Sequence, residues 1–180
     1  MGCPNNWGTD EQGGSDVPCV DIGRIVKDGD NEDQKNGTYY HFQAASVGTG
    51  SAITTNNANV PDTFCPLGWQ LPYGGTAGEY YNQSKSWKYL FDNYSVTYDN
   101  GDAIQATKIR SYPFSYIYSG LYHLQTGRLY QQNNYGGYWS SVIGNDSSAG
   151  YRLIFGLKSI QVSASVGKNN AQAIRCVTRN

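Results

Sequence analysis

The second half of this chain is a series of short strand-like segments separated by turn residues, and this pattern restricts the fold most strongly. Runs rich in β-branched and aromatic residues alternate there with Gly, Asn and Asp. The predicted strands are Ile109–Tyr112, Gly127–Gln131, Gly137–Ser141, Tyr151–Phe155, Ile160–Ser163 and Ala173–Thr178. A long, regular alternation of strands and helices is missing, so the pattern predicts an α+β domain rather than a doubly wound parallel sheet.

One helix is predicted ahead of these strands. Its apolar residues recur at the i, i+3, i+4, i+7 spacing of a single helix face: Trp87, Leu90, Phe91 and Tyr94. Ser84 is expected to cap its start. Further upstream we expect a strand at Thr38–Phe42, a long loop from Val47 to Asn59, and a short proline-bounded strand within Cys65–Pro72. Residues 1–37, which are rich in turn residues, are expected to form an N-terminal arm of the same single domain, residues 1–180.

The charge pattern argues against several partners. The formal net charge is -1 and the basic residues are scattered, so we expect no nucleic acid partner. No apolar run reaches the roughly 20 residues that cross a bilayer, so membrane insertion is not expected. The start at Met1 has no secretory signal pattern, which leaves export by another route or a signal that precedes this sequence. The expected location is extracellular, on a cell surface or on a virion.

The four cysteines allow two interpretations. Cys3, Cys19, Cys65 and Cys176 lack the paired spacing of a zinc site. An even number permits two disulfides, of which Cys3–Cys19 and Cys65–Cys176 are the simplest pairing. Reduced, buried cysteines are the alternative.

Three motifs together resemble a known family. They are Cys65–Pro72 ahead of the predicted helix, Gly-Tyr-Trp-Ser-Ser at Gly137–Ser141, and Ala-Ile-Arg-Cys-Val at Ala173–Val177. In this order they resemble the prokaryotic C-type lectin-like domains, especially the variable proteins of diversity-generating retroelements, with a wider relation to formylglycine-generating enzymes. The resemblance runs from Thr38 to the end. It implies a mixed, mostly antiparallel sheet with one or two helices and long loops, chain ends that pair in the sheet, and a ligand-binding variable region at residues 137–177.

The strand at Ala149–Gly156 has two chemically different faces. Ala149, Tyr151, Leu153 and Phe155 alternate as a core face. The other face combines Gly150, Arg152, Ile154 and Gly156, a mixture typical of positions whose identity is free to vary or is chosen for a partner. In the retroelement family, rewriting of template adenines changes Asn codons in this region into others. The ligand, an unknown protein or glycan, is therefore expected to contact these four residues together with Tyr138, Gly144, Asn145, Asp146, Gln161, Ala164 and Val166.

Tyrosines are expected to frame this site, because they combine a large contact area with few rotatable bonds. The candidates are Tyr130, Tyr135 and Tyr138. By contrast, Trp139 is expected in the core, as are Trp69 and Trp87, since large aromatic residues supply much of a small domain's buried area. The competing interpretation of the mixed face is an ordinary sheet edge with a few exposed apolar residues.

No catalytic residue, cofactor or metal site is predicted. His41 and His123 have no nearby ligand partners in the sequence, and the triplets that bind sugar through calcium in C-type lectins do not occur. Aspartates near residue 30 could hold an adventitious calcium ion. A formylglycine-generating-like oxidase using Cys65 and Cys176 is an alternative, although both lie in scaffold-like motifs and the chain is short for that class. An invariant adhesion module of a surface protein is another.

Overall fold

The computed structural model describes residues 39–48, 50, 55–75, 80, 82–98, 103–123 and 126–178. The predicted N-terminal arm, the Cys3–Cys19 pair and the aspartates near residue 30 lie outside these ranges. Most of the predicted Val47–Asn59 loop and of the three motifs lies inside them.

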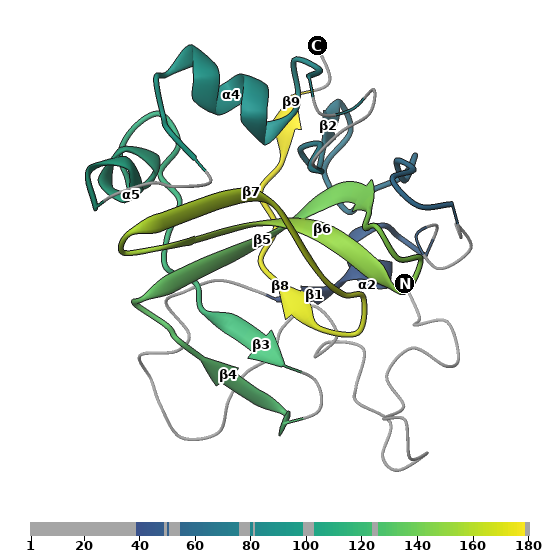
Figure 1. Ribbon diagram of the computed structural model, residues 1–180. Helices are drawn as coiled ribbons and strands as arrows, with labels where there is room; N and C mark the ends of the chain where they lie inside the picture. The colour runs from purple at the N-terminus through teal and green to yellow at the C-terminus, as the bar shows by residue number, and fades with distance from the viewer. Residues whose placement is uncertain are drawn as a thin grey trace.

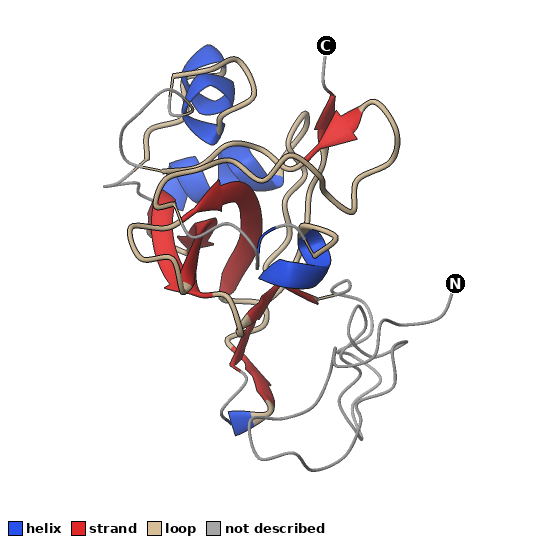
Figure 2. Ribbon diagram, turned by 90° about the vertical axis from the view of Figure 1, so that its right-hand side faces the viewer, coloured by secondary structure: helices blue, strands red, loops and turns tan. Residues whose placement is uncertain are grey.

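A three-stranded antiparallel sheet forms the centre of the molecule (Figure 1). Its strands are β5 (Tyr135–Ile143), β6 (Ala149–Gly156) and β7 (Ser159–Gly167). They contain the predicted strands at 137–141, 151–155 and 160–163 and extend each of them. The register of β5 against β6 shifts between Trp139 and Ile143, and that of β6 against β7 shifts between Arg152 and Ile154. Such irregularities increase local twist, and the curled strands are visible in Figure 2.

Two smaller sheets tie distant parts of the chain together. The four-stranded sheet has the order β1-β8-β3-β4, and the two-stranded sheet pairs β2 with β9. Their bounds are β1 (Tyr40–His41), β2 (Trp69–Gln70), β3 (Leu121–His123), β4 (Arg128–Tyr130), β8 (Ala171–Gln172) and β9 (Val177–Thr178). All paired strands in them are antiparallel, as in the central sheet. An early segment therefore pairs with a late one twice, at Tyr40 with Gln172 and at Gln70 with Val177.

The segment after β8 joins the sheets. Ala173 donates its backbone N–H to Gly137 at 3.1 Å, and Trp139 donates to Ala173 at 3.0 Å, so this segment runs beside β5. It then reaches Cys176, which forms a disulfide with Cys65. The predicted Cys65–Cys176 pairing is thus confirmed, whereas the single predicted strand at 173–178 is interrupted before β9.

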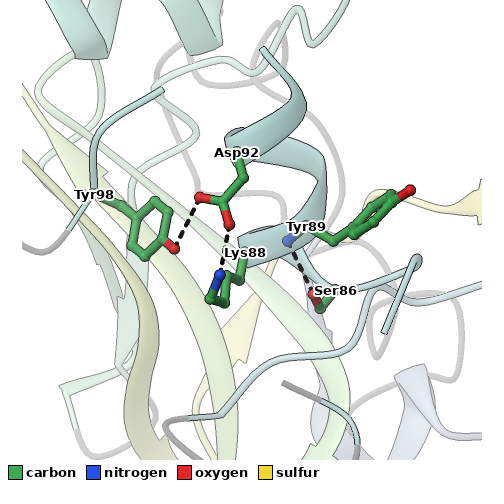
Figure 3. A network of polar contacts seen from close by, with 5 residues as sticks. All are labelled: Ser86, Lys88, Tyr89, Asp92 and Tyr98. Atoms are coloured by element: carbon green, nitrogen blue, oxygen red, sulfur yellow. Dashed lines mark hydrogen bonds and ion pairs between the residues drawn. The ribbon is translucent and has the colours of Figure 1, made fainter. Parts of the chain in front are cut away.

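Three helices lie within the described ranges: α2 (Phe42–Ala45), α4 (Trp87–Asn93) and α5 (Ala103–Arg110). The predicted helix corresponds to α4. Ser86, not Ser84, caps it by accepting the backbone N–H of Tyr89 at 3.0 Å (Figure 3). On its exposed side Lys88 pairs with Asp92 at 2.5 Å, and Asp92 also accepts the Tyr98 hydroxyl.

Two buried clusters flank the central sheet. One packs α4, α5 and the 114–118 segment against β5–β7, and its largest members include Trp87, Phe91, Ile109, Tyr116, Tyr138 and Phe155. The other packs α2 against Trp139 and Ile143 of β5. Two expectations were wrong here: Ile109 belongs to helix α5 rather than to a strand, and Trp69 is 42% exposed rather than part of the core.

The described chain is therefore an α+β domain built mostly from antiparallel sheets. None of its described helices combines the length and apolar character needed to cross a membrane.

Candidate functional site

Strand β6 separates a closed face from a partly open one. Tyr151, Leu153 and Phe155 are each 0% exposed, and Leu153 and Phe155 belong to the buried cluster that includes residues of α4 and α5. Arg152 and Ile154, between them, are only half-buried. The alternation predicted from the sequence is confirmed along this part of the strand.

The neighbouring strands extend the open part of this face. Ile154 pairs with Gln161, and Arg152 pairs with Ala164, both on β7. Gln161 is exposed and Ala164 is half-buried. We call these four residues together with Tyr130 and Tyr135 the β6–β7 patch.

The two tyrosines border the patch from the side of β4 and β5. Tyr130 is 42% exposed and lies close enough to Arg152 to raise the pKa of its guanidinium, against the effect of burial. Tyr135 is half-buried and pairs with Gly156, where its ring lies over the glycine. Of the three tyrosines expected to frame a ligand site, these two belong to the patch, and their contact with a ligand stays a prediction.

Arg152 is the only charged member of the patch. Its Nη1 donates to Oε1 of Gln172 at 3.2 Å, while its Nε is buried with no acceptor. Burial lowers the pKa of the Arg152 guanidinium, and Tyr130 opposes this shift. An arginine side chain remains cationic at neutral pH in either case. The patch therefore holds a partly buried positive charge.

Gln172 was not anticipated as part of the site. Its side chain is 1% exposed and reaches Arg152 because β8 lies across the face of β5. Gly137 makes this possible, since a Cβ at that position would come within 2.1 Å of the Gln172 Oε1. No local pattern marks Gln172, because its position depends on pairing between distant strands.

Two glycines expected in the ligand-binding face are instead points of close packing. A Cβ at Gly150 would meet the Phe42 ring at 2.6 Å and Trp139 at 3.1 Å. A Cβ at Gly156 would meet the Tyr135 ring at 2.7 Å. Both glycines are buried. Their prediction as ligand contacts was wrong. The sequence pattern suggested that glycine stands at these positions because their identity is free to vary, whereas the neighbouring aromatic rings leave no space for a side chain.

Four other predicted contacts lie in the turn between β5 and β6 or, for Val166, on β7 opposite Gly150. Gly144 is buried, and a Cβ at this position would come within 2.7 Å of Ser165 and 3.1 Å of Ala149. Val166 packs against the buried cluster that contains α2 residues and Trp139. The side-chain oxygen of Asn145 accepts a hydrogen bond from the Tyr151 hydroxyl. Asp146 accepts the Ser148 backbone N–H at 2.8 Å, and this hydrogen bond lowers the pKa of its carboxyl. Asn145 and Asp146 are exposed and lie in the turn between β5 and β6, and no contact in the described ranges joins them to Arg152.

Tyr138 was also predicted as a ligand contact, and the structure contradicts this. It is 4% exposed and lies in the core, stacked on Phe155 and edge-to-face with Tyr116. Its hydroxyl donates to the backbone carbonyl of Ile117 at 3.1 Å. Burial raises the pKa of the Tyr138 phenol. Trp139, expected in the core, is indeed fully buried, with its indole N–H donated to the Tyr40 carbonyl.

Two other kinds of site, a metal centre and a catalytic pocket, have less support in the described ranges. Within the described ranges, His, Cys, Asp and Glu side chains form no group that could hold a metal ion. A hollow of about 450 Å³ lies beside α5, with the residues Tyr94, Val96, Ile104, Thr107, Lys108, Ser111, Tyr112, Pro113 and Phe114 around it. Lys108 is its single ionisable group apart from the tyrosines, and that ammonium already donates to the Ser95 carbonyl at 2.8 Å. The hollow therefore lacks an acid, base or nucleophile arranged for catalysis.

Comparison with known proteins adds no relative. No family model, curated protein or solved structure matches this chain. The function has to be argued from the residues of the patch and from the motifs in the sequence.

Proposed function

We propose that this protein is a non-enzymatic binding protein with a C-type lectin-like fold, which recognises a protein or glycan through the β6–β7 patch. One observation carries the proposal. On a single strand, fully buried residues alternate with half-buried residues of unrelated chemistry, Arg152 and Ile154. Such a strand can keep its fold through one face while the other face contacts a partner.

The fold assignment is supported by where the three motifs lie. Cys65 and Cys176, from the first and last motifs, are joined covalently. Trp139 of the second motif is buried beside Phe42, with ring centroids 5.2 Å apart. β1, the first strand among the described residues, pairs with the late strand β8, as expected for a domain whose early and late segments meet in a sheet.

The patch has the composition of a recognition surface. Tyr130 and Tyr135 offer large, rigid contact areas with a hydroxyl, and Ile154 and Gln161 add an apolar and an amide group. Substitutions at partly exposed positions such as Gln161 usually change stability by no more than about 0.5 kcal/mol. A surface of this kind can change its specificity without loss of the fold, which is the property that a diversified variable protein needs.

The binding role can be tested with arrays of glycans and of displayed peptides. We expect the full chain to bind specific members, and the double variant Ile154→Ala, Gln161→Ala to lose at least about tenfold in affinity for them. The matched control is Thr107→Ala, Lys108→Ala on the exposed side of α5, which should bind like the wild type. Equal binding by the patch variant and the wild type would show that recognition lies elsewhere.

Diversification is a separate part of the proposal and has its own test. The encoding locus should contain a reverse transcriptase gene and a near-identical repeat of the region for residues 137–177 that differs at adenines. We further expect the differing codons to fall on patch positions such as Ile154, Gln161 and Ala164 rather than on Gly150 or Tyr138. A locus without these features favours an invariant adhesion module that uses the same surface.

A further inference from the structure

We infer that the ligand of the β6–β7 patch is a protein that presents an Asp or Glu carboxylate to Arg152. This inference rests on the proposed function, because it names the chemistry of the partner that the patch would bind. It depends on the charge of Arg152, on how its guanidinium is held, and on the residues around it.

In the described part of the chain, the positive charge of Arg152 is not matched by an ion-pair partner. No carboxylate in the described ranges forms an ion pair with it, and its one hydrogen bond goes to the neutral amide oxygen of Gln172. The exposed Lys88, in contrast, has Asp92 at 2.5 Å. Partly burying an arginine without a counter-charge carries a desolvation cost, so an incoming carboxylate gains much of its attraction without a new cost on the protein side.

The guanidinium is held in place before a ligand arrives. Gly137 leaves the space that the Gln172 amide occupies, and that amide accepts from Nη1 of Arg152. The Nε is covered and has no acceptor, and the Gln172 oxygen takes one N–H of Nη1, so the remaining N–H groups of Nη1 and Nη2 are the donors left for a ligand oxygen. Because fewer side-chain rotations remain to be lost on binding, this positioning favours affinity.

The surroundings of Arg152 favour a protein carboxylate over a phosphate or a highly charged glycan. Arg152 is the single cation of the patch, whereas phosphate groups are usually held by several donors or cations. Ala164 is its partner on β7, Ile154 follows two residues later on β6, and Tyr130 lies near the guanidinium. This combination of one charge within apolar and aromatic area matches an acidic side chain flanked by apolar residues on a protein surface.

The first experiment selects ligands from a random peptide library displayed on phage, using the full chain as bait. We expect the enriched peptides to carry an Asp or Glu beside apolar residues. Replacing that acid by its amide in a synthetic peptide should weaken binding about tenfold or more, since hydrogen bonds to charged groups contribute about 1.5–3 kcal/mol. This comparison needs no variant of the protein, so the folding of a variant does not affect it.

The second experiment changes the protein. Arg152→Gln should remove the preference for the acidic peptide over its amide, and Arg152→Lys should keep part of it. The matched control is Arg128→Gln, which removes one charge from the exposed side chain at the start of β4 and should retain the full preference. Binding by the wild type should also weaken as salt concentration rises.

The outcomes separate this inference from the proposed function. Peptides that depend on Ile154 and Gln161 but carry no acid would overturn the inference and leave the binding role intact. Peptides whose binding is unaffected by the double variant Ile154→Ala, Gln161→Ala would overturn both. Arg152-dependent binding of sialylated or uronic-acid glycans on an array, without acidic peptides, would overturn the choice of a protein partner.

Discussion

Arg152 and Gly150 lie on the same face of β6, two residues apart, yet their surroundings give them opposite roles. Gly150 is covered by Phe42 and Trp139, so its lack of a side chain is a packing requirement. Arg152 carries a charge that its neighbours leave without a counter-charge. Residue type and alternation identified the face correctly, but they could not show how far α2 and β8 cover it, because that depends on contacts between distant segments.

Replacing Arg152 by Met tests whether this residue serves stability or binding. We expect the free energy of unfolding to change by no more than about 1 kcal/mol, because removal of a partly buried charge and an unpaired Nε offsets the loss of the hydrogen bond to the buried Gln172 amide. Urea denaturation measures this, with Arg128→Met as the exposed control. A loss of more than about 2 kcal/mol would mean that Arg152 is mainly structural.

Gly150→Ala tests whether Gly150, at the covered end of the same face, is a point of close packing. The new methyl group would overlap the Phe42 ring, so we expect a loss of about 1–3 kcal/mol in the free energy of unfolding. Gln161→Ala, in the open part of the face, should change it by no more than about 0.5 kcal/mol. If both variants unfold at the same urea concentration as the wild type, Gly150 is not the packing point described above.

At the scale of secondary-structure elements, the sequence predicts the strands and helices that have a clear pattern within their own residues. The core strands β5, β6 and β7 and helix α4 were predicted because each carries a clear apolar period or a run of β-forming residues. Helix α5 was not predicted, because it buries only Ala106 and Ile109 and has no continuous apolar stripe. Strands such as β1 and β8 are two residues long and exist because they pair with each other, so no local pattern can define them.

The start of α4 allows a sharp test with two nearby serines. Ser86 caps the helix and is buried, whereas Ser84 is exposed. We expect Ser86→Ala to lower the free energy of unfolding by about 1 kcal/mol and Ser84→Ala to leave it nearly unchanged. Chemical denaturation of the two variants side by side provides the measurement, and the reverse order would place the cap at Ser84.

At the scale of the whole molecule, one covalent link and several strand pairs connect the early and late parts of the chain. The Cys65–Cys176 disulfide spans 111 residues, and β2 pairs with β9 next to it. Together they fix the C-terminal end of residues 137–177, the region that we propose to be variable. This arrangement explains how one face of β6 and β7 could change while the rest of the fold stays constant.

The disulfide should contribute substantially to this framework. Linking residues far apart in sequence restricts the unfolded chain, so the double variant Cys65→Ala, Cys176→Ala should lose about 2–5 kcal/mol of unfolding free energy. Urea denaturation of this variant, compared with the oxidised wild type, measures the loss. An unchanged midpoint would show that strand pairing alone holds the two ends together.

The central claim, that β6 and β7 combine a fixed framework with a replaceable surface, is tested most directly by substituting every residue of the two strands. Each variant would be displayed on yeast and scored with a conformation-specific antibody. We expect nearly all amino acids to be accepted at Ile154, Gln161 and Ala164, and few at Gly150, Leu153 and Phe155. Equal intolerance at Ile154 and Leu153 would contradict the account.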